Sequence, residues 1–310
     1  MHYFALMTSD YCEVAQIGLI SFFKFNDVVL NLYVCDEGYD KVVDFFKDKP
    51  YRDKLNIVNV YDEKTSNYIY SIKHNSVFFA TNVALMTLWS FYILDKIKDD
   101  DLIRVDLDVI YFDSIKPLEN IRDCSMCGAE ESDDCKRRAD STDPLNHTPK
   151  QQINVGICKF NKSKFNLKKT FVEEMSERLK HDSIHYLVPE QDILNELAVD
   201  KRAYTDQTII AQYMDITKID YSKNVLAFHF NGTYTKPWVN YTYDKIFKSN
   251  FIFCCGVKLF SEFSIRYNLF IKTVKLNQLY TKYRLSNLHS ETERNFVNLT
   301  DNLIERIKEW

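Results

Sequence analysis

The chain has 310 residues, of which 45% are hydrophobic and 27% charged, so it can form one large α/β domain or two smaller ones around a sizeable core. Its formal net charge of −4 argues against a polyanion-binding surface, and we expect no nucleic-acid partner. No run of about 18 apolar residues is present, so no membrane span is predicted. The N-terminus lacks the basic and long apolar regions of a signal peptide, and the 8 cysteines fit reduced, buried thiols, so we expect a cytoplasmic protein.

The first third of the chain alternates between strand-like and helix-like patterns. The expected strands cover 3–9, 28–36, 54–62 and 102–112, and the expected helices cover 12–25, 39–48 and 75–97. Strands that alternate with helices predict a mostly parallel sheet with helices on both faces. In such a sheet, ligands bind at the carboxyl ends of the strands.

The rest of the chain begins with a polar stretch, 123–150, which predicts a loop or an insertion. Strands are expected over 151–161 and 224–232, helices over 164–181, 190–199, 206–214 and 298–310, and the apolar run 251–257 is strand-like. The basic and aromatic segment 264–288 is interpreted as part of a helical subdomain, with contact to an anionic membrane surface as a further role.

Two carboxylates, Asp106 and Asp108, interrupt the apolar strand over 102–112. A buried carboxylate costs several kcal/mol unless something pairs with it. In an ideal strand, residues i and i+2 lie on the same side, so both carboxylates can converge on one ion. Their hard oxygen ligands suit Mn²⁺ or Mg²⁺, which also hold substrate phosphates. The alternative is a solvated strand end without a ligand.

A second group of polar residues lies in "LAFHFNGTYTKPW", residues 226–238. His229 follows a strand and is a plausible third ligand for Mn²⁺. Gly232 allows close approach of the backbone, and the charge of Lys236 suits a phosphate group. A lone histidine is more often structural, so the pattern gains its meaning from the combination with the two aspartates.

Three segments in this order, "RVDLDVIYFDSI", "INVGICKFN" and "HFNGTYTKPW", resemble glycosyltransferase family 8, which includes bacterial lipopolysaccharide galactosyl- and glucosyltransferases and glycogenin. The resemblance covers roughly residues 3 to 240. It implies an α/β fold of the GT-A type, a Rossmann-like nucleotide-sugar-binding fold. We expect the catalytic domain over 1–248 and a mainly helical C-terminal appendage over 249–310, facing a membrane or a partner.

The resemblance also implies an activity. We expect a retaining, Mn²⁺-dependent hexosyltransferase of polysaccharide biosynthesis that moves glucose or galactose from a UDP-sugar to a glycan, lipid-linked glycan or protein. The alternatives are a UDP-sugar hydrolase, a toxin that glycosylates a protein, and a catalytically inactive protein that binds a sugar nucleotide. The expected location is the cytoplasm, with peripheral contact to the inner face of the membrane through the C-terminal tail.

The resemblance implies a role for individual residues. The metal ligands are Asp106, Asp108 and His229, and Asp106 also lies near the donor's ribose and sugar. The Gly232 backbone and Lys236 contact the diphosphate. The other implied contacts are to the nucleoside, by Thr8, Asp10 and Tyr11, with Tyr11 stacking on uracil, and to the donor sugar or acceptor, by Asn154 and Gly156.

The sequence departs from the family pattern in three places. The spacing from Gly232 to Lys236 is one residue longer than usual, and Trp89 stands where the family carries a basic residue. The family's Asp-Gln motif has two candidates: spacing favours Gln191, whereas residue identity favours Asp206 and Gln207. We slightly favour Asp206 and Gln207, because that pair supplies both side chains.

Overall fold

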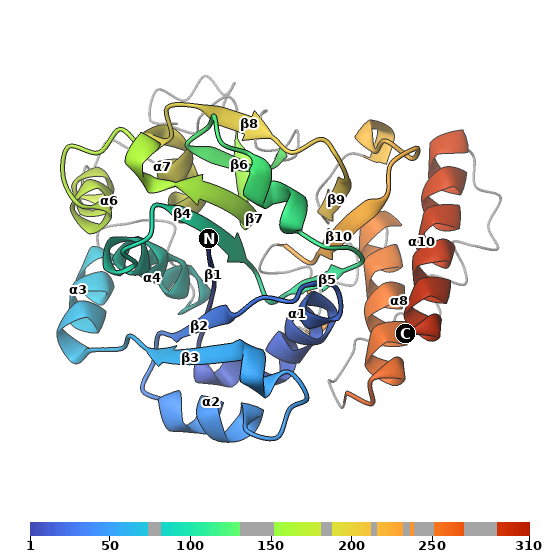
Figure 1. The fold of residues 1–310 in the computed structure, drawn as a ribbon, viewed down its shortest axis with the longest axis horizontal. Helices are drawn as coiled ribbons and strands as arrows, with labels where there is room; N and C mark the ends of the chain where they lie inside the picture. The colour runs from blue at the N-terminus through green and yellow to red at the C-terminus, as the bar shows by residue number, and fades with distance from the viewer. Residues whose placement is uncertain are drawn as a thin grey trace. The chain divides into compact units, whose positions relative to one another are not determined.

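The computed structural model describes residues 1–73, 82–130, 152–180, 188–211, 216–231, 236–238, 251–269 and 290–310. These residues form two compact units. The first unit comprises Met1–Cys12, Asn26–Leu107 and Ile115–Thr205, and the second comprises Glu13–Phe25, Asp108–Ser114 and Asp206–Trp310. The chain is drawn in Figure 1 with the labels used below.

The first unit is built on a seven-stranded sheet in the order β3-β2-β1-β4-β7-β6-β8. Its strands are β1 (His2–Met7), β2 (Leu30–Val34), β3 (Leu55–Asn59), β4 (Asp101–Val105), β6 (Met126–Glu130), β7 (Ile153–Asn161) and β8 (Lys201–Ala203). β1, β2, β3 and β4 are parallel to one another, whereas β7 is antiparallel to both of its neighbours, β4 and β6. β7 therefore runs against the other strands of this sheet, as the arrows in Figure 1 show.

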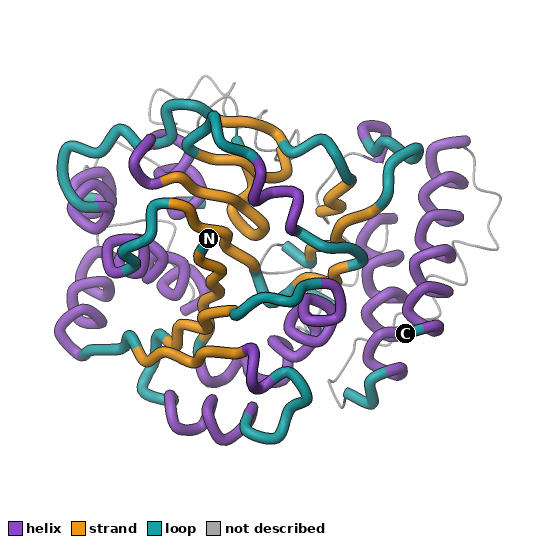
Figure 2. Tube along the Cα trace, viewed as in Figure 1, coloured by secondary structure: helices purple, strands orange, loops and turns teal. Residues whose placement is uncertain are grey.

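Helices cover the sheet of the first unit. They are α2 (Tyr39–Phe46), α3 (Glu63–Lys73), α4 (Asn82–Lys96), α6 (Phe171–Leu179) and α7 (Pro189–Leu197). α4 packs against β1 and also contacts α3, α6 and α7. α6 begins with a capping box, in which Thr170 and Glu173 satisfy each other's backbone N–H groups. Figure 2 shows the strands in orange and the helical segments in purple.

The described residues of the second unit include a three-stranded sheet in the order β5-β10-β9 and several helices. These elements are β5 (Val109–Tyr111), β9 (Thr208–Ala211), β10 (Val225–His229), α1 (Cys12–Phe25), α8 (Phe251–Arg266) and α10 (Glu291–Glu309). α8 and α10 pack along each other (Figure 1). Trp310 follows α10, and its ring packs against Phe25, Phe112 and Phe263.

Short 3₁₀ helices connect several of these elements. They are η1 (Ser9–Tyr11), η2 (Arg52–Lys54), η3 (Lys116–Asn120), η4 (Lys162–Lys164) and η5 (Ile216–Lys218). Among the residues described, no helix is both long and apolar enough to cross a membrane. The domain boundary expected near residue 248 falls among residues outside the described part, so it stays a prediction.

The structure differs from the expected secondary structure in five places. The expected strand over 102–112 is two strands, β4 and β5, because the chain turns at Asp106–Asp108. The expected helix over 206–214 contains the strand β9, and the strand-like run 251–257 lies in helix α8. Periodicity does not distinguish a short buried strand from a buried helix, which explains both errors. β6 lies within the expected loop, and α3 had no counterpart among the expected helices.

Gly128 in β6 is a position where the close approach of β7 requires the absence of a side chain. A Cβ atom here would lie 2.8 Å from the carbonyl oxygen of Ile157 and 2.9 Å from Cγ2 of Ile153. We expect Gly128→Ala to lower the free energy of unfolding by about 1–3 kcal/mol, the usual effect of overpacking. Urea denaturation measures the loss, with Ala129→Ser on the same strand as the control. Equal stability of Gly128→Ala and the parent would show that β6 and β7 can move apart without cost.

Candidate metal and nucleotide site

The Asp-x-Asp segment is a turn that joins β4 to β5. The backbone N–H of Asp106 donates to the carbonyl of Gly156 in β7 (2.6 Å). The carbonyl of Asp108 accepts from the N–H of Phe230, the residue that follows β10 (2.9 Å). Each aspartate is therefore anchored to a different strand, and strand alternation does not explain how their side chains converge. The turn does so, because a single residue separates them in the chain.

Asp108 is a buried carboxylate with two basic partners, the ammonium group of Lys236 and the imidazole of His229. Its side chain is 9% exposed, its Oδ2 lies 2.7 Å from Lys236 Nζ, and its Oδ1 lies 3.4 Å from His229 Nε2. Burial alone would raise the pKa of Asp108, but Lys236 and His229 outweigh burial and hold this pKa below its ordinary range. The pairing of β5 with β10, in which Val109 faces His229, fixes the imidazole beside the carboxylate.

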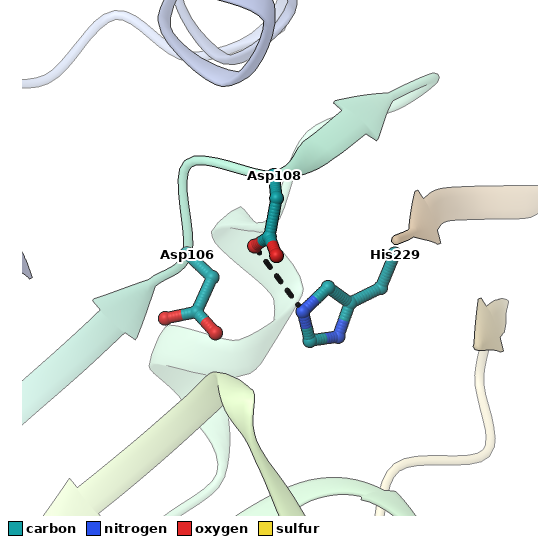
Figure 3. Close-up of side chains that lie close together, drawn as sticks. All are labelled: Asp106, Asp108 and His229. Atoms are coloured by element: carbon teal, nitrogen blue, oxygen red, sulfur yellow. Dashed lines mark ion pairs between the residues drawn. The ribbon is translucent and has the colours of Figure 1, made fainter. Parts of the chain in front are cut away.

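The side chains of Asp106, Asp108 and His229 each offer one ligand atom, and these atoms lie within 4.8 Å of one another (Figure 3). Asp106 comes from the end of β4, Asp108 from the start of β5 and His229 from the end of β10. Two carboxylates and one imidazole form a donor set that fits Mn²⁺, whereas Mg²⁺ prefers oxygen ligands throughout. The structure thus brings together a possible metal-binding group of the kind that the sequence predicts.

The expected nucleoside-binding residues lie just past the carboxyl end of β1. Thr8 and Tyr11 are half-buried and Asp10 is exposed. The Thr8 hydroxyl donates to the Asp10 carboxylate, and the Tyr11 N–H donates to the Thr8 carbonyl (3.0 Å). β1 and β4 are parallel neighbours, so this segment and Asp106 lie at the same edge of the sheet.

A second carboxylate holds this segment in place. Asp36, just after β2, accepts hydrogen bonds from both the N–H and the hydroxyl of Ser9, each 2.8 Å long. Gly38 follows closely, and a Cβ atom at this position would lie 2.1 Å from Ser9 Oγ. The sequence carried a signal for this contact, because Asp36 ends an expected strand one position along the sheet from β1.

Asn154 and Gly156 lie near the amino end of β7. Since β7 is antiparallel to β4, its amino end shares an edge with the carboxyl end of β4, and Val105 pairs with Ile157. Asn154 is buried, and its Oδ1 accepts from the Gly156 N–H (2.9 Å). The structure thus places both residues at the same sheet edge as Asp106, and the Gly156 carbonyl accepts the Asp106 N–H.

Gln191 also belongs to this edge of the first unit. It lies in the first turn of α7 and is buried. Its Nε2 donates to Gln152 Oε1 (3.0 Å), and its Oε1 accepts from the Val155 N–H (3.4 Å). The preceding residue, Glu190, is connected to Asp106 through Arg104, which contacts both carboxylates.

The alternative pair, Asp206 and Gln207, lies at the other end of the small sheet. β9 and β10 are parallel, with Thr208 paired to Val225 and Ala211 paired to His229. Asp206 and Gln207 precede β9, so they lie about four residues, roughly 13 Å, from the level of His229 along the strands. Gln207 donates instead to Asp113 Oδ2 (2.7 Å). The structure does not bring this pair to the metal-ligating residues.

Arg104 is a residue of this region that the sequence motifs did not identify. This arginine is buried in β4, and it contacts both Asp106 and Glu190. A signal was present: an arginine within the apolar run 102–112, two residues before an aspartate, needs a carboxylate on the same side of the strand.

The position of the expected basic residue is occupied by Trp89, which is buried in α4 and packs against Tyr61 and Tyr92. Gly232 lies outside the described residues.

Lys236 provides a test of the charge balance at Asp108. We expect Lys236→Met to lower the free energy of unfolding by about 3 kcal/mol, because removing one partner leaves a buried charge without its nearest cation. Excess Mn²⁺ should stabilise this variant more than the parent, since a metal would supply the missing charge. Urea denaturation with and without Mn²⁺ measures both effects. Lys47→Met, which removes an exposed partner of Asp44, serves as the control and should change little.

Equal stability of Lys236→Met and the parent in the absence of metal would contradict this account. It would mean that His229 alone neutralises Asp108.

Comparison with solved structures identifies the fold of the chain. No family model and no curated protein matches the chain. Among solved structures, the galactosyltransferase LgtC in complex with donor and acceptor sugar analogues has a TM-score of 0.55 and 15% identity, covering 77% of this chain and 90% of its own. The glycosyltransferase GlyE of Streptococcus pneumoniae TIGR4 has a TM-score of 0.52 and 12% identity, covering 91% of this chain and 62% of its own. The chain thus has the GT-A fold of glycosyltransferases.

Proposed function

We propose that this protein is a retaining glycosyltransferase that moves a hexose, glucose or galactose, from a UDP-sugar to a glycan, lipid-linked glycan or protein acceptor with the help of Mn²⁺. The observation that carries the proposal is the convergence of Asp106, Asp108 and His229 in a chain with the GT-A fold. A solved neighbour with this fold, LgtC, was crystallised with donor and acceptor sugar analogues. The position of Asp106 just past the carboxyl end of β4 supports a nucleotide-binding role.

The charged side chains of the site support the same role. Mn²⁺, when bound by Asp106, Asp108 and His229, would supply positive charge to the donor diphosphate. Lys236 would exchange its contact with Asp108 for a phosphate oxygen and stabilise the negative charge that grows on departing UDP. Thr8, Asp10 and Tyr11, at the neighbouring strand end, would hold the nucleoside, with Tyr11 stacking on uracil.

Retention is implied by the resemblance to glycosyltransferase family 8, and it leaves two mechanisms to choose between. A double displacement with retention needs a group that attacks the anomeric carbon, and the amide of Gln191 is a poor nucleophile. We therefore favour a front-face displacement, in which the departing diphosphate accepts the proton of the acceptor hydroxyl. Asn154 and Gln191 would then orient the sugar and the acceptor, which is a matter of proximity and alignment.

The donor is identified by a screen for UDP release. The protein would be incubated with Mn²⁺ and each of UDP-glucose, UDP-galactose, UDP-N-acetylglucosamine and UDP-N-acetylgalactosamine. We expect slow release from one hexose donor and a loss of about 100-fold or more in Asp108→Asn, since the carboxylate would hold the metal. Asp44→Asn, on the exposed face of α2, should keep the rate of the parent.

The outcomes separate the alternatives. Release that does not rise with any added glycan acceptor would indicate a UDP-sugar hydrolase. UDP binding without release would indicate an inactive sugar-nucleotide-binding protein. Neither release nor Mn²⁺-dependent UDP binding by calorimetry would refute the glycosyltransferase proposal and leave Asp106 and Asp108 with a structural role.

The two glutamines can be distinguished by parallel variants. We expect Gln191→Ala to lower turnover of the identified donor at least tenfold more than Gln207→Ala, because only Gln191 is connected to Asp106 through Glu190 and the arginine of β4. Steady-state rates at saturating donor measure the difference, and circular dichroism checks that both variants fold. A greater loss in Gln207→Ala would favour the motif that residue identity supports.

A further inference from the structure

Arg104 is a cation buried in the middle of the first unit's sheet. Its side chain is 6% exposed, and β4, which carries it, is buried along nearly its whole length. Burial alone would lower the pKa of Arg104, but Glu190 and Asp106 outweigh this effect and raise it. The guanidinium is thus held in its charged form among apolar strands.

The guanidinium joins two carboxylates from different elements. Nε and Nη2 both lie 3.2 Å from Oδ1 of Asp106, so two N–H groups hold the same oxygen of this carboxylate. Nη1 contacts Oε1 of Glu190 in the first turn of α7. A planar guanidinium fixes the direction of each partner, which a lysine ammonium does not.

Glu190 is itself fixed from other sides. It is 3% exposed, it pairs with Ser90 of α4 as well as with Arg104, and it lies at the start of a helix, where a negative charge is favoured. Burial raises the pKa of Glu190, and Arg104 opposes that rise. Gln191 follows directly, so the arginine connects Asp106 to the segment that carries this glutamine.

Stability alone does not account for these buried charges. Apolar residues that replace a buried ion pair often leave a protein equally stable or more stable. Apolar side chains in place of both Arg104 and Glu190 would therefore serve the fold equally well, and the pair would be dispensable if it served only the fold. A role in holding the partly exposed Asp106 explains why the cost of burying Arg104 and Glu190 is retained.

We propose that Arg104 is a positioning residue for the nucleotide site: it restrains the Asp106 carboxylate and couples it to the start of α7. The inference rests on the proposed function, because Asp106 is a proposed metal ligand. It adds a residue that touches neither metal nor donor but sets the direction of a group that touches both.

The test separates positioning from stability with a double variant. Arg104→Met leaves Glu190 buried and uncompensated, so it should lower the unfolding midpoint markedly. Arg104→Met with Glu190→Gln removes both charges and should recover most of that midpoint. We expect the double variant nevertheless to bind UDP at least tenfold more weakly in the presence of Mn²⁺, the usual size of an effect from a residue behind a metal ligand. Isothermal titration calorimetry measures the affinity.

A matched control lies in the same unit. Arg178 contacts the buried Glu174 within α6, with Nη1 2.5 Å from Oε2. Arg178→Met with Glu174→Gln should change the unfolding midpoint but leave the affinity for UDP and Mn²⁺ unchanged. Arg104→Lys keeps the positive charge but loses the planar pair of N–H groups that holds Asp106. It should bind UDP with an affinity between those of the double variant and the parent.

Two results would overturn the inference in distinguishable ways. If the parent binds UDP in a Mn²⁺-dependent manner and the folded double variant binds it equally well, Arg104 is a structural ion pair only. If the parent itself shows no Mn²⁺-dependent UDP binding, the proposed function fails and the positioning role fails with it.

Discussion

The charge balance around Asp108 is the interaction on which the site depends. A carboxylate this deeply buried is tolerated only because Lys236 and His229 lie against it. His229 comes from the end of β10. β10 pairs with β5, the strand that directly follows Asp108. The short antiparallel pair therefore fixes the histidine and the aspartate together. Lys236 follows only a few residues later, so one segment supplies both partners of the carboxylate.

The reversed strand β7 sets the second half of the site. In a wholly parallel sheet, the amino end of the strand beside β4 would lie at the opposite edge from the carboxyl ends of β1 and β4. Because β7 is antiparallel, Asn154 and Gly156 lie at the same edge as Thr8 and Asp106. The hydrogen bond from the Asp106 N–H to the Gly156 carbonyl continues the ladder by one residue and starts the turn. The mixed direction of the sheet is thus a requirement of the site.

Much of this arrangement could be predicted from the sequence, because the candidate site residues stand at the ends of strongly apolar segments. Polar residues follow the strands that end at Met7 and Val34, Asp106 follows β4, and His229 ends β10. The turn at Asp106–Asp108 was hidden, since apolar residues on both sides suggest one continuous strand. The choice between Gln191 and Gln207 was beyond local reasoning, because it depends on the register of β9 against β10.

The two cations of the site explain why its carboxylates can lie so close together. Arg104 holds Asp106 and Glu190, and Lys236 holds Asp108, so three carboxylates face two permanent positive charges. Under the proposed function, a divalent cation held by Asp106, Asp108 and His229 would add positive charge beside these carboxylates and favour an anionic diphosphate. The cations are therefore as necessary to the chemistry as the aspartates, although only the aspartates form a recognisable motif.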